Sequence, residues 1–324
     1  MKNFNDSLSE IGNKLLASES IYLFPHVNMD GDTLGSAVAI CKALRNAGKE
    51  CWVLIEDDVV LYLKFLDKGY CTYDQDKIKN PDICMCIDCA DIDRFIKRKE
   101  KFLRGKTTMC IDHHFTSLHF ADYNYIDPTA GATGEIIYDL LCEMNLSIDQ
   151  EMGEALFAAI TTDTGNFQYS NTTRKTHIVV GNLYDIGIDA NKVSVEIYEN
   201  VRLEKLLIKC KGISTMQVFA DGKAAIAFVT QNMLSEIGAT IDETEGIGEM
   251  LRSISGIEIS AFLKEENSTT IKVGMRAKTY GNVAKICEKF GGGGHIKAAG
   301  CTINDTMEAA TRLIMEEIEN QLND

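Results

Sequence analysis

The stretch that decides the fold is SIYLFPHVNMDGD (residues 20–32), in which an apolar run gives way to a polar turn. Residues 20–25 are almost continuously hydrophobic, which predicts a buried β-strand. A helical pattern follows from Thr33 to Ala47. Strand, turn and helix in this order predict the first unit of an α/β fold.

Three further apolar runs have the same character, at 50–56, 82–88 and 107–112, and are rich in Val, Ile, Cys and Met. Such runs are typical of parallel strands that helices cover on both faces. Helical patterns at 131–144 and 152–160 follow them. We therefore predict a doubly wound parallel sheet in the N-terminal part of the chain.

The pattern changes after about residue 185. Residues 190–210 are typical of one long helix, 214–230 of a hairpin that turns at Asp221–Gly222, and 257–278 of a second hairpin. A short helix from Asn282 to Phe290 precedes a run of glycines. These elements predict a smaller mixed α/β domain.

We expect an α/β protein of two domains, with its active site in the cleft between them. The predicted parts are a catalytic, metal-binding domain at 1–190, a connector helix at 191–212 and a substrate-binding domain at 213–324.

Composition narrows the class of protein. The 324 residues are 45% hydrophobic and 25% charged, as in soluble globular proteins. We find neither a signal peptide nor an apolar run long enough to span a bilayer, and most of the eleven cysteines lie in apolar runs. A protein of the reducing cytoplasm is the simplest expectation.

A net charge of −15 argues against broad attraction to long nucleic acids. Residues 264–297 are the exception, because seven basic and three acidic side chains give a local net charge of +4. This segment is either an anion-facing region or a solvated helix face, and charge alone does not separate the two.

Acidic and histidine side chains follow several predicted elements. His26, Asp30 and Asp32 follow the first strand, and Asp88 ends the strand at 82–88. The remaining candidates are Asp112, His113 and His114 after the strand at 107–112, and Asp163 after the run that ends at Ile160. Because the carboxyl ends of parallel strands form one edge of a sheet, these segments are expected to converge there.

Taken singly, each residue has a simpler interpretation. Asp32 alone is best explained as the cap of the helix that follows it, and His26 alone as a hydrogen-bonded surface residue. At least four carboxylates and two imidazoles together exceed the needs of one tetrahedral zinc ion. They suit two divalent ions about 3.5–4 Å apart that share a carboxylate.

Mixed oxygen and imidazole ligands favour Mn²⁺ over Mg²⁺, without excluding Mg²⁺. Two such ions fit phosphoryl transfer. Deacetylases and amidohydrolases also activate water with metals, so the ligand set leaves the reaction class open.

A second chemical signal is the run Gly291, Gly292, Gly293, Gly294 and His295. Consecutive glycines expose backbone N–H groups and can form an anion-binding nest. Arg276 lies upstream in a predicted strand and could hold a phosphate or carboxylate with its guanidinium. A flexible surface loop is the alternative, but the adjoining cationic side chains favour phosphate binding.

Two other motifs are weaker. Cys84, Cys86 and Cys89 resemble a thiolate site, but Cys89 points to the opposite face of the strand from the other two. The sequence Thr133–Gly134–Glu135 is most simply the start of a helix, with a carboxylate favoured by the helix dipole.

The motifs HVNMDGDTLGS (26–36), IDCAD (87–91), DHH (112–114), TDTG (162–165) and GGGGHIKAAG (291–300) occur in one order. In this combination the chain resembles the DHH phosphoesterase family, and most closely its short branch of nanoRNases and pAp phosphatases. Gly274 and Ala277 stand where serines are expected around Arg276.

The resemblance implies roles for the candidate residues. His26 and Asp30 would hold one Mn²⁺ ion, Asp32, His113 and Asp163 a second, and Asp88 would bridge them. Asp112 would orient His113, and His114 would face the scissile phosphate, which makes Asp112 and His114 the catalytic candidates. In the DHH-associated C-terminal domain, Arg276, His295 and the glycine run would bind the far phosphate and terminal nucleoside.

The implied activity is Mn²⁺-dependent hydrolysis of short oligonucleotides such as pApA, of 3′-phosphoadenosine 5′-phosphate (pAp), or of both. A cyclic dinucleotide phosphodiesterase, an inorganic pyrophosphatase and a non-catalytic nucleotide sensor remain alternatives. The expected partners are small nucleotides, with no long duplex and no membrane. The connector helix could support a homodimer.

Overall fold

The computed structural model describes residues 5–323, and the chain divides into two compact units between Asn200 and Val201. The first unit holds the candidate metal ligands, and the second holds the glycine run. Each unit has its own sheet and its own hydrophobic core.

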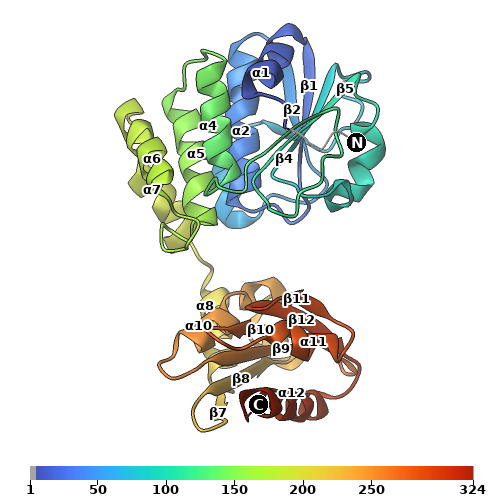
Figure 1. Cartoon of the computed structure of the whole chain (residues 1–324), viewed down its shortest axis with the longest axis vertical. Coiled ribbons are helices and arrows are strands. Elements are labelled where there is room, and N and C mark those ends of the chain that lie inside the picture. The colour runs from blue at the N-terminus through green and yellow to red at the C-terminus, as the bar shows by residue number, and fades with distance from the viewer. Residues whose placement is uncertain (1–4, 324) are drawn as a thin grey trace. The chain divides into compact units, whose positions relative to one another are not determined.

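Unit 1 is built on a six-stranded parallel sheet of order β3-β2-β1-β4-β5-β6 (Figure 1). Its elements are α1 (Leu8–Ala17), β1 (Ser20–Pro25), α2 (Gly31–Asn46), β2 (Glu50–Leu54), a 3₁₀-helix (Leu61–Leu66), β3 (Cys71–Thr72), β4 (Ile83–Ile87), a 3₁₀ segment (Ile92–Arg98), α3 (Lys99–Phe102), β5 (Thr107–Asp112), β6 (Tyr123–Ile126), α4 (Thr133–Glu143), α5 (Gln150–Asp163), α6 (Arg174–Ile186), α7 (Ala190–Ser194) and a π-helical turn (Val195–Glu199). The strand order reverses between β1 and β4, which confirms the predicted doubly wound sheet. The edge strands β3 and β6 are short, and sequence analysis did not predict them.

Both faces of this sheet are buried, and alternate strand residues serve different cores. Leu23 and Met85 belong to the core that α2, α4 and α5 cover. Phe24 points the other way and packs on Phe102 with ring centroids 5.2 Å apart. Burial on both faces explains why the strands are almost continuously hydrophobic.

Small residues let the three covering helices approach closely. A Cβ atom on Gly35 of α2 would lie 2.4 Å from the carbonyl oxygen of Ala155 in α5. A Cβ atom on Gly134 of α4 would lie 2.7 Å from the Cβ atom of Ala159. This packing fixes the positions of the helix ends that carry Asp32, Thr133 and Asp163.

The continuous helix expected at 191–212 is not present. The π-helical turn ends at Glu199, Arg202 is extended, and a separate helix begins at Leu203. The two halves of this segment pack on different units. In the first half, the Tyr198 hydroxyl donates to the Thr161 carbonyl oxygen of unit 1 at 2.9 Å. Ile208 instead lies in a core of unit 2.

Unit 2 contains a six-stranded mixed sheet of order β11-β12-β10-β9-β8-β7. Its elements are α8 (Leu203–Ile213), β7 (Gln217–Phe219), β8 (Ala224–Val229), α9 (Gln231–Ile237), a 3₁₀-helix (Ile241–Thr244), α10 (Ile247–Ser253), β9 (Ile259–Asn267), β10 (Thr270–Ala277), α11 (Val283–Glu288), β11 (Gly293–His295), β12 (Ala298–Ile303) and α12 (Met307–Asn323). Strands β8 and β9 are parallel, and the other neighbours are antiparallel. Both predicted hairpins are present, as β7–β8 and β9–β10.

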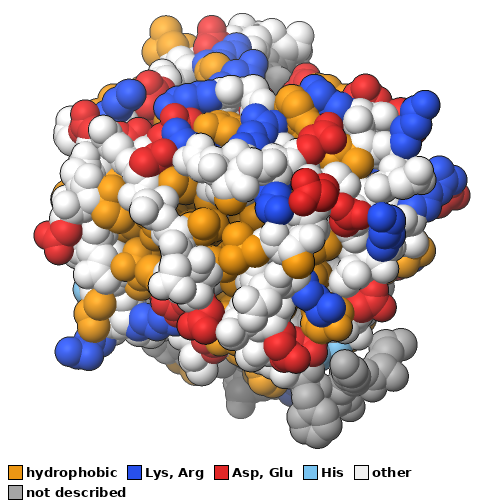
Figure 2. Space-filling view, turned by 90° about the horizontal axis from the view of Figure 1, so that it is seen from above, with side chains coloured by type: hydrophobic (Ala, Val, Ile, Leu, Met, Phe, Trp, Pro, Cys, Tyr) orange, Lys and Arg blue, Asp and Glu red, His pale blue; other side chains and the backbone are white. Residues whose placement is uncertain are grey.

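Different helices cover the two faces of this second sheet. Val273 and Met275 of β10 point into a core that α11 and α12 complete. On the other face, α8 and α10 pack over residues of β8 and β9, including Phe262. Figure 2 is seen from above the view of Figure 1 and does not show a face of this second sheet. On the surface that it shows, Lys and Arg are interspersed with Asp and Glu around hydrophobic atoms, so that surface is not broadly basic. Among residues 5–323, no helix has the length and apolar character needed to cross a bilayer.

Candidate metal centre

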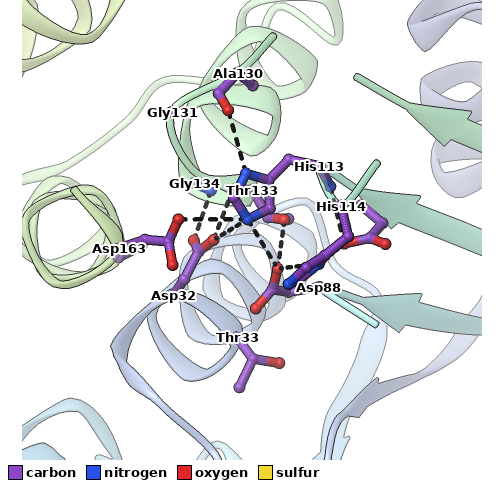
Figure 3. A network of polar contacts seen from close by, with 12 residues as sticks. Asp32, Thr33, Asp88, His113, His114, Ala130, Gly131, Thr133, Gly134 and Asp163 are labelled. Carbon is purple, nitrogen blue, oxygen red and sulfur yellow. Dashed lines mark hydrogen bonds and ion pairs between the residues drawn. The ribbon is translucent and has the colours of Figure 1, made fainter. Parts of the chain in front are cut away.

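Six predicted ligands converge beyond the carboxyl edge of the parallel sheet. Figure 3 labels four of them: Asp32, Asp88, His113 and Asp163. His26 follows β1, Asp88 follows β4 and His113 follows β5, while Asp30 and Asp32 lie at the N-terminus of α2. Asp163 is the last residue of α5. It therefore reaches the cluster from the C-terminal end of a helix, whereas His26, Asp88 and His113 directly follow strands.

His26 presents one ring nitrogen to two carboxylates. Its Nδ1 atom lies 2.7 Å from the carbonyl oxygen of Val27. Because a carbonyl oxygen only accepts, Nδ1 must carry the proton. The Nε2 atom lies 3.6 Å from an oxygen of Asp30 and 3.6 Å from Oδ2 of Asp88. In the neutral ring, the Nε2 lone pair therefore faces the carboxylates, as in a metal ligand.

His113 is oriented in the same way. Its Nδ1 atom lies 3.2 Å from the carbonyl oxygen of Ala130. Its Nε2 atom lies 3.4 Å from Oδ2 of Asp163, 3.7 Å from Oδ1 of Asp88 and 3.8 Å from Oδ2 of Asp32. A backbone carbonyl thus fixes the tautomer that leaves Nε2 free to bind a cation.

The carboxylate of Asp88 lies between the two imidazoles, with Oδ2 toward His26 and Oδ1 toward His113. These separations exceed the usual hydrogen-bond length of about 2.7–3.2 Å. They match ligand atoms that surround a common ion, because two atoms each about 2.0–2.2 Å from a metal lie roughly 3–4 Å apart. Three groups of donor atoms could hold an ion: His26, Asp30 and Asp88; Asp32, His113 and Asp163; and Asp88, His113 and His114.

Asp32 does not cap its own helix. Asp30 has that role, because its side chain accepts the N–H of Thr33 at 3.0 Å. Asp32 instead accepts the N–H groups of Thr133 and Gly134 at 2.7 and 2.9 Å. The N-cap residue of α4, Ala132, makes no side-chain cap bond, so Asp32 supplies the missing acceptor.

Thr133 also binds the central carboxylate. Its hydroxyl donates to Oδ1 of Asp88 at 2.8 Å, and its side chain is fully buried (Figure 3). Sequence analysis treated the segment 133–135 mainly as a helix start and gave Thr133 no site role. The sequence did contain one signal for such a role. The residue before this helix is Ala132, whose side chain cannot cap it, so the helix N-terminus needs an acceptor from elsewhere in the chain.

Asp112 bonds a different histidine from the one expected. Its Oδ1 atom lies 2.7 Å from Nδ1 of His114 and accepts the backbone N–H of His113 at 2.8 Å. The His113 ring faces a backbone carbonyl, as described above. The expectation that Asp112 orients the His113 ring is therefore wrong, and His114 is the imidazole it holds.

Electrostatics favour a bound cation. Burial lowers the pKa of His26, but the carboxylates of Asp30 and Asp88 outweigh burial and raise that pKa to about 10. Burial and neighbouring carboxylates raise the pKa of Asp32 well above its usual range. Burial also raises the pKa of Asp163 to about 6, against the charge of His113. Clustered, buried carboxylates repel one another, and a divalent cation would relieve that repulsion.

Two groups outside the predicted set support the cluster. Arg98 is buried, and its Nη2 atom donates to the carbonyl oxygen of Pro25, directly before His26, at 2.8 Å. The side-chain amide of Asn171 donates to Oδ2 of Asp163 at 3.3 Å. Local sequence does not predict the Arg98 contact, because its partners lie 73 residues apart along the chain.

The predicted phosphate-binding residues lie together on the sheet of unit 2. His295 of β11 pairs with Ala298 of β12, which pairs with Arg276 of β10. The Nε atom of Arg276 donates to Glu249 of α10 at 2.8 Å. Lys297, which sequence analysis counted among the possible donors, instead donates to the carbonyl oxygens of Thr279 and Gly281.

The cysteine motif belongs to the hydrophobic core. Cys84, Cys86 and Cys89 are buried and pack in one cluster with Phe95 and Phe102. The expectation that Cys89 points to the opposite face is therefore wrong, because β4 ends at Ile87 and the positive φ of Asp88 breaks the strand alternation. Within the described part of the chain, the three possible metal-binding groups contain only histidine and aspartate.

Two family models match the chain, and related proteins are known. Residues 20–160 match the model of the DHH family, N-terminal domain, and residues 221–324 match the DHHA1 domain. The chain is 27% identical to the bifunctional oligoribonuclease and PAP phosphatase NrnA of Thermus thermophilus, over 93% of this chain and 90% of the relative.

Two solved structures share the fold. An exopolyphosphatase-related protein from Bacteroides fragilis superposes with a TM-score of 0.89 at 24% identity, covering 99% of this chain and 98% of that one. An exonuclease RecJ bound to manganese superposes with a TM-score of 0.55 at 12% identity, covering 98% and 94%.

Proposed function

Because the chain belongs to the DHH family of phosphoesterases, we propose that it hydrolyses short oligonucleotides such as pApA, and pAp, with two divalent ions. We take Mn²⁺ as the preferred ion, because the ligand set mixes carboxylate oxygen with imidazole nitrogen. The relative from Thermus thermophilus, named an oligoribonuclease and PAP phosphatase, supports the substrate class.

One observation carries the two-ion proposal: the two oxygens of Asp88 face two separate groups of donor atoms. In this proposal, His26 and Asp30 hold one ion, Asp32, His113 and Asp163 hold the other, and Asp88 bridges them. When bound, such a pair of ions makes water a stronger nucleophile at neutral pH and neutralises charge on the phosphoryl group.

The protein's own residues would orient the phosphate. His114 is partly exposed beside the cluster, and Asp112 holds its Nδ1 atom at 2.7 Å. The hydrogen bond from Asp112 raises the pKa of His114 to about 9, so the ring carries a proton at neutral pH. A protonated His114 can donate Nε2–H to a phosphate oxygen and offset its developing charge.

On unit 2, Arg276 and His295 would bind a second phosphate of the substrate. Their side chains stand on one face of the sheet, in register across three strands. Glu249 holds the Nε atom of Arg276, which fixes the plane of the guanidinium. A site of this kind suits a small substrate that carries a second phosphate.

The test is a comparison of hydrolysis rates for pAp, pApA, oligomers of two to five nucleotides, cyclic di-AMP and pyrophosphate, with Mn²⁺ and with EDTA. We expect Mn²⁺-dependent cleavage of pApA or pAp. Asp88→Ala should lower the rate roughly a thousandfold, since bridging two metals contributes several kcal/mol. Asp82→Ala, at the other end of β4, is the matched control and should retain activity. Equal rates for Asp88→Ala and the parent would refute the two-ion proposal, and a preference for cyclic di-AMP or pyrophosphate would refute the substrate class.

A further inference from the structure

Phe115 differs from the other phenylalanines of the protein in its exposure. It is 89% exposed, which makes it the most exposed large hydrophobic residue among residues 5–323. Every other phenylalanine in that range is buried or half-buried. Phe115 directly follows His114, which belongs to one of the groups of possible metal ligands. An exposed aromatic ring is therefore attached one residue from the side chain that we expect to face the scissile phosphate.

Backbone hydrogen bonds fix the turn that carries Phe115. The N–H of Ser117 donates to the carbonyl oxygen of His114 at 3.0 Å, which closes a β-turn with Phe115 at its first central position. The next N–H, that of Leu118, donates to the carbonyl oxygen of Ala90 in the segment after β4 at 2.9 Å. The turn is thus tied to two segments that follow strands, and it holds Phe115 at the carboxyl edge of the parallel sheet.

The fold does not require an aromatic residue at this position. Turns favour Gly, Pro, Asn, Asp and Ser, and a ring as exposed as that of Phe115 buries almost no surface in the protein. Two other exposed aromatic residues show the contrast. The ring of Tyr169 lies against Gly165, where a Cβ atom would come within 2.4 Å of it, and Tyr184 packs on Phe157 with ring centroids 6.2 Å apart. Packing accounts for both tyrosines and leaves Phe115 without an explanation.

The surroundings of Phe115 favour a small planar ligand over a protein partner. Between residues 113 and 120, the exposed large hydrophobic side chains are those of Phe115 and Leu118. A stable protein interface involves about 20–30 residues on each side, so these two side chains alone do not form one. A single ring at the edge of a site is instead typical of proteins that stack the unpaired bases of short nucleic acids.

The ring of Phe115 matches one part of the proposed substrate. In the proposed function, His114 contacts the scissile phosphate of pApA and unit 2 binds the second phosphate. The nucleoside on the far side of the scissile phosphate has no contact in that account. Its base is joined to the phosphate through one sugar, and Phe115 is joined to His114 directly, with Cα atoms about 3.8 Å apart. The base is therefore expected within reach of the ring.

We propose that Phe115 stacks on the base of the nucleoside whose 5′-oxygen carries the scissile phosphate, and that this contact favours dinucleotides over pAp. The proposal rests on the proposed function, because that function places the scissile phosphate beside His114. In pAp no base follows the phosphate that is removed, so the contact is available to pApA and not to pAp. Every base has a flat π-surface, so the contact requires a base without selecting among bases.

The test measures kcat/KM of the full-length protein with Mn²⁺ on three substrates: pApA, an analogue of pApA with an abasic second sugar, and pAp. The parent should cleave pApA at least about tenfold more efficiently than the abasic analogue. Phe115→Ala should lose about 10–100-fold on pApA, chiefly through a higher KM, and should change by less than about twofold on the other two substrates. Phe115→Trp keeps a flat ring and should restore cleavage of pApA.

Two controls separate stacking from a structural effect. Phe115→Ala removes an exposed side chain and should leave the midpoint of urea unfolding unchanged. Leu103→Ala removes a side chain that is 57% exposed and precedes the amino end of β5, at the opposite edge of the sheet. This second variant should cleave all three substrates as the parent does.

Stacking by Phe115 is refuted if the parent cleaves pApA and its abasic analogue equally, or if Phe115→Ala lowers the rates on pApA and pAp alike or changes neither. A parent that cleaves none of the three substrates overturns the proposed function instead. Calorimetric binding of pApA and its abasic analogue with Mn²⁺ then tests Phe115 separately. A preference for pApA that Phe115→Ala removes supports the stacking contact, and equal binding of the two ligands by the parent, or a preference that the variant keeps, overturns it.

Discussion

Replacing Thr133 with valine tests how the centre is held together. The Thr133 hydroxyl is buried and donates to Oδ1 of Asp88 at 2.8 Å. Valine keeps the shape of the side chain and the backbone N–H that binds Asp32, and removes only the hydroxyl. A hydrogen bond to a charged group contributes about 1.5–3 kcal/mol. Since each 1.4 kcal/mol is about tenfold in affinity, the Kd for Mn²⁺ should rise roughly 10–100-fold.

The assay is a Mn²⁺ titration followed by calorimetry and, in parallel, by the rate of pApA hydrolysis. We expect the activity curve of Thr133→Val to shift to higher Mn²⁺ concentration and to recover most of the parent rate at saturation. Thr108→Val is the matched control, because the Thr108 hydroxyl donates to Asp122 at 2.9 Å at the opposite end of β5. Unchanged Mn²⁺ affinity in Thr133→Val, or an equal loss in Thr108→Val, would refute the assigned role of Thr133.

Three further predictions concern packing and protonation. Gly35→Ala should destabilise the protein by about 1–3 kcal/mol in urea unfolding, because its Cβ atom would overlap a carbonyl oxygen of α5 at 2.4 Å. Gly181→Ala on α6, where a Cβ atom meets nothing within 4 Å, should instead gain up to about 1 kcal/mol. Hydrogen bonds from Lys106 and the backbone lower the pKa of Asp82 to about 2, so this carboxylate stabilises the fold above pH 4 and loses that effect as the pH falls to 2. Asp82→Asn should therefore cost on the order of 1 kcal/mol at pH 7 and nothing near pH 2, and a pH-independent difference would contradict this. Because His26, with a pKa near 10, is protonated at neutral pH, Mn²⁺ binding should release at least one proton at pH 7 and should strengthen as the pH rises. Calorimetry in buffers of different ionisation enthalpy measures this release, and a release of no protons would argue against His26 as a ligand.

The convergence of most candidate ligands could be predicted from sequence because parallel strands share one carboxyl edge. His26, Asp88 and His113 directly follow β1, β4 and β5, so the topology alone brings them together. The alternation of apolar runs and helices likewise predicted the doubly wound sheet. The structure thus shows that these side chains lie close together, and the metal-binding role of each residue stays a prediction.

The remaining contacts depend on packing that local sequence does not encode. Asp163 reaches the cluster because Gly35 lets α2 approach α5, and Thr133 does so because Gly134 lets α4 approach the same helix. Whether Asp112 bonds His113 or His114 depends on side-chain direction after β5. Similarly, the connector was predicted as one helix because its helical pattern continues from 190 to 210, whereas packing on two different units divides it.

The most direct test of the central claim is anomalous diffraction at the manganese edge, from crystals of the full-length protein grown with Mn²⁺. Two peaks about 3.5–4 Å apart are predicted, one beside His26 and one beside His113, with the carboxylate of Asp88 between them. A single peak, or none within reach of Asp88, would contradict the two-ion account.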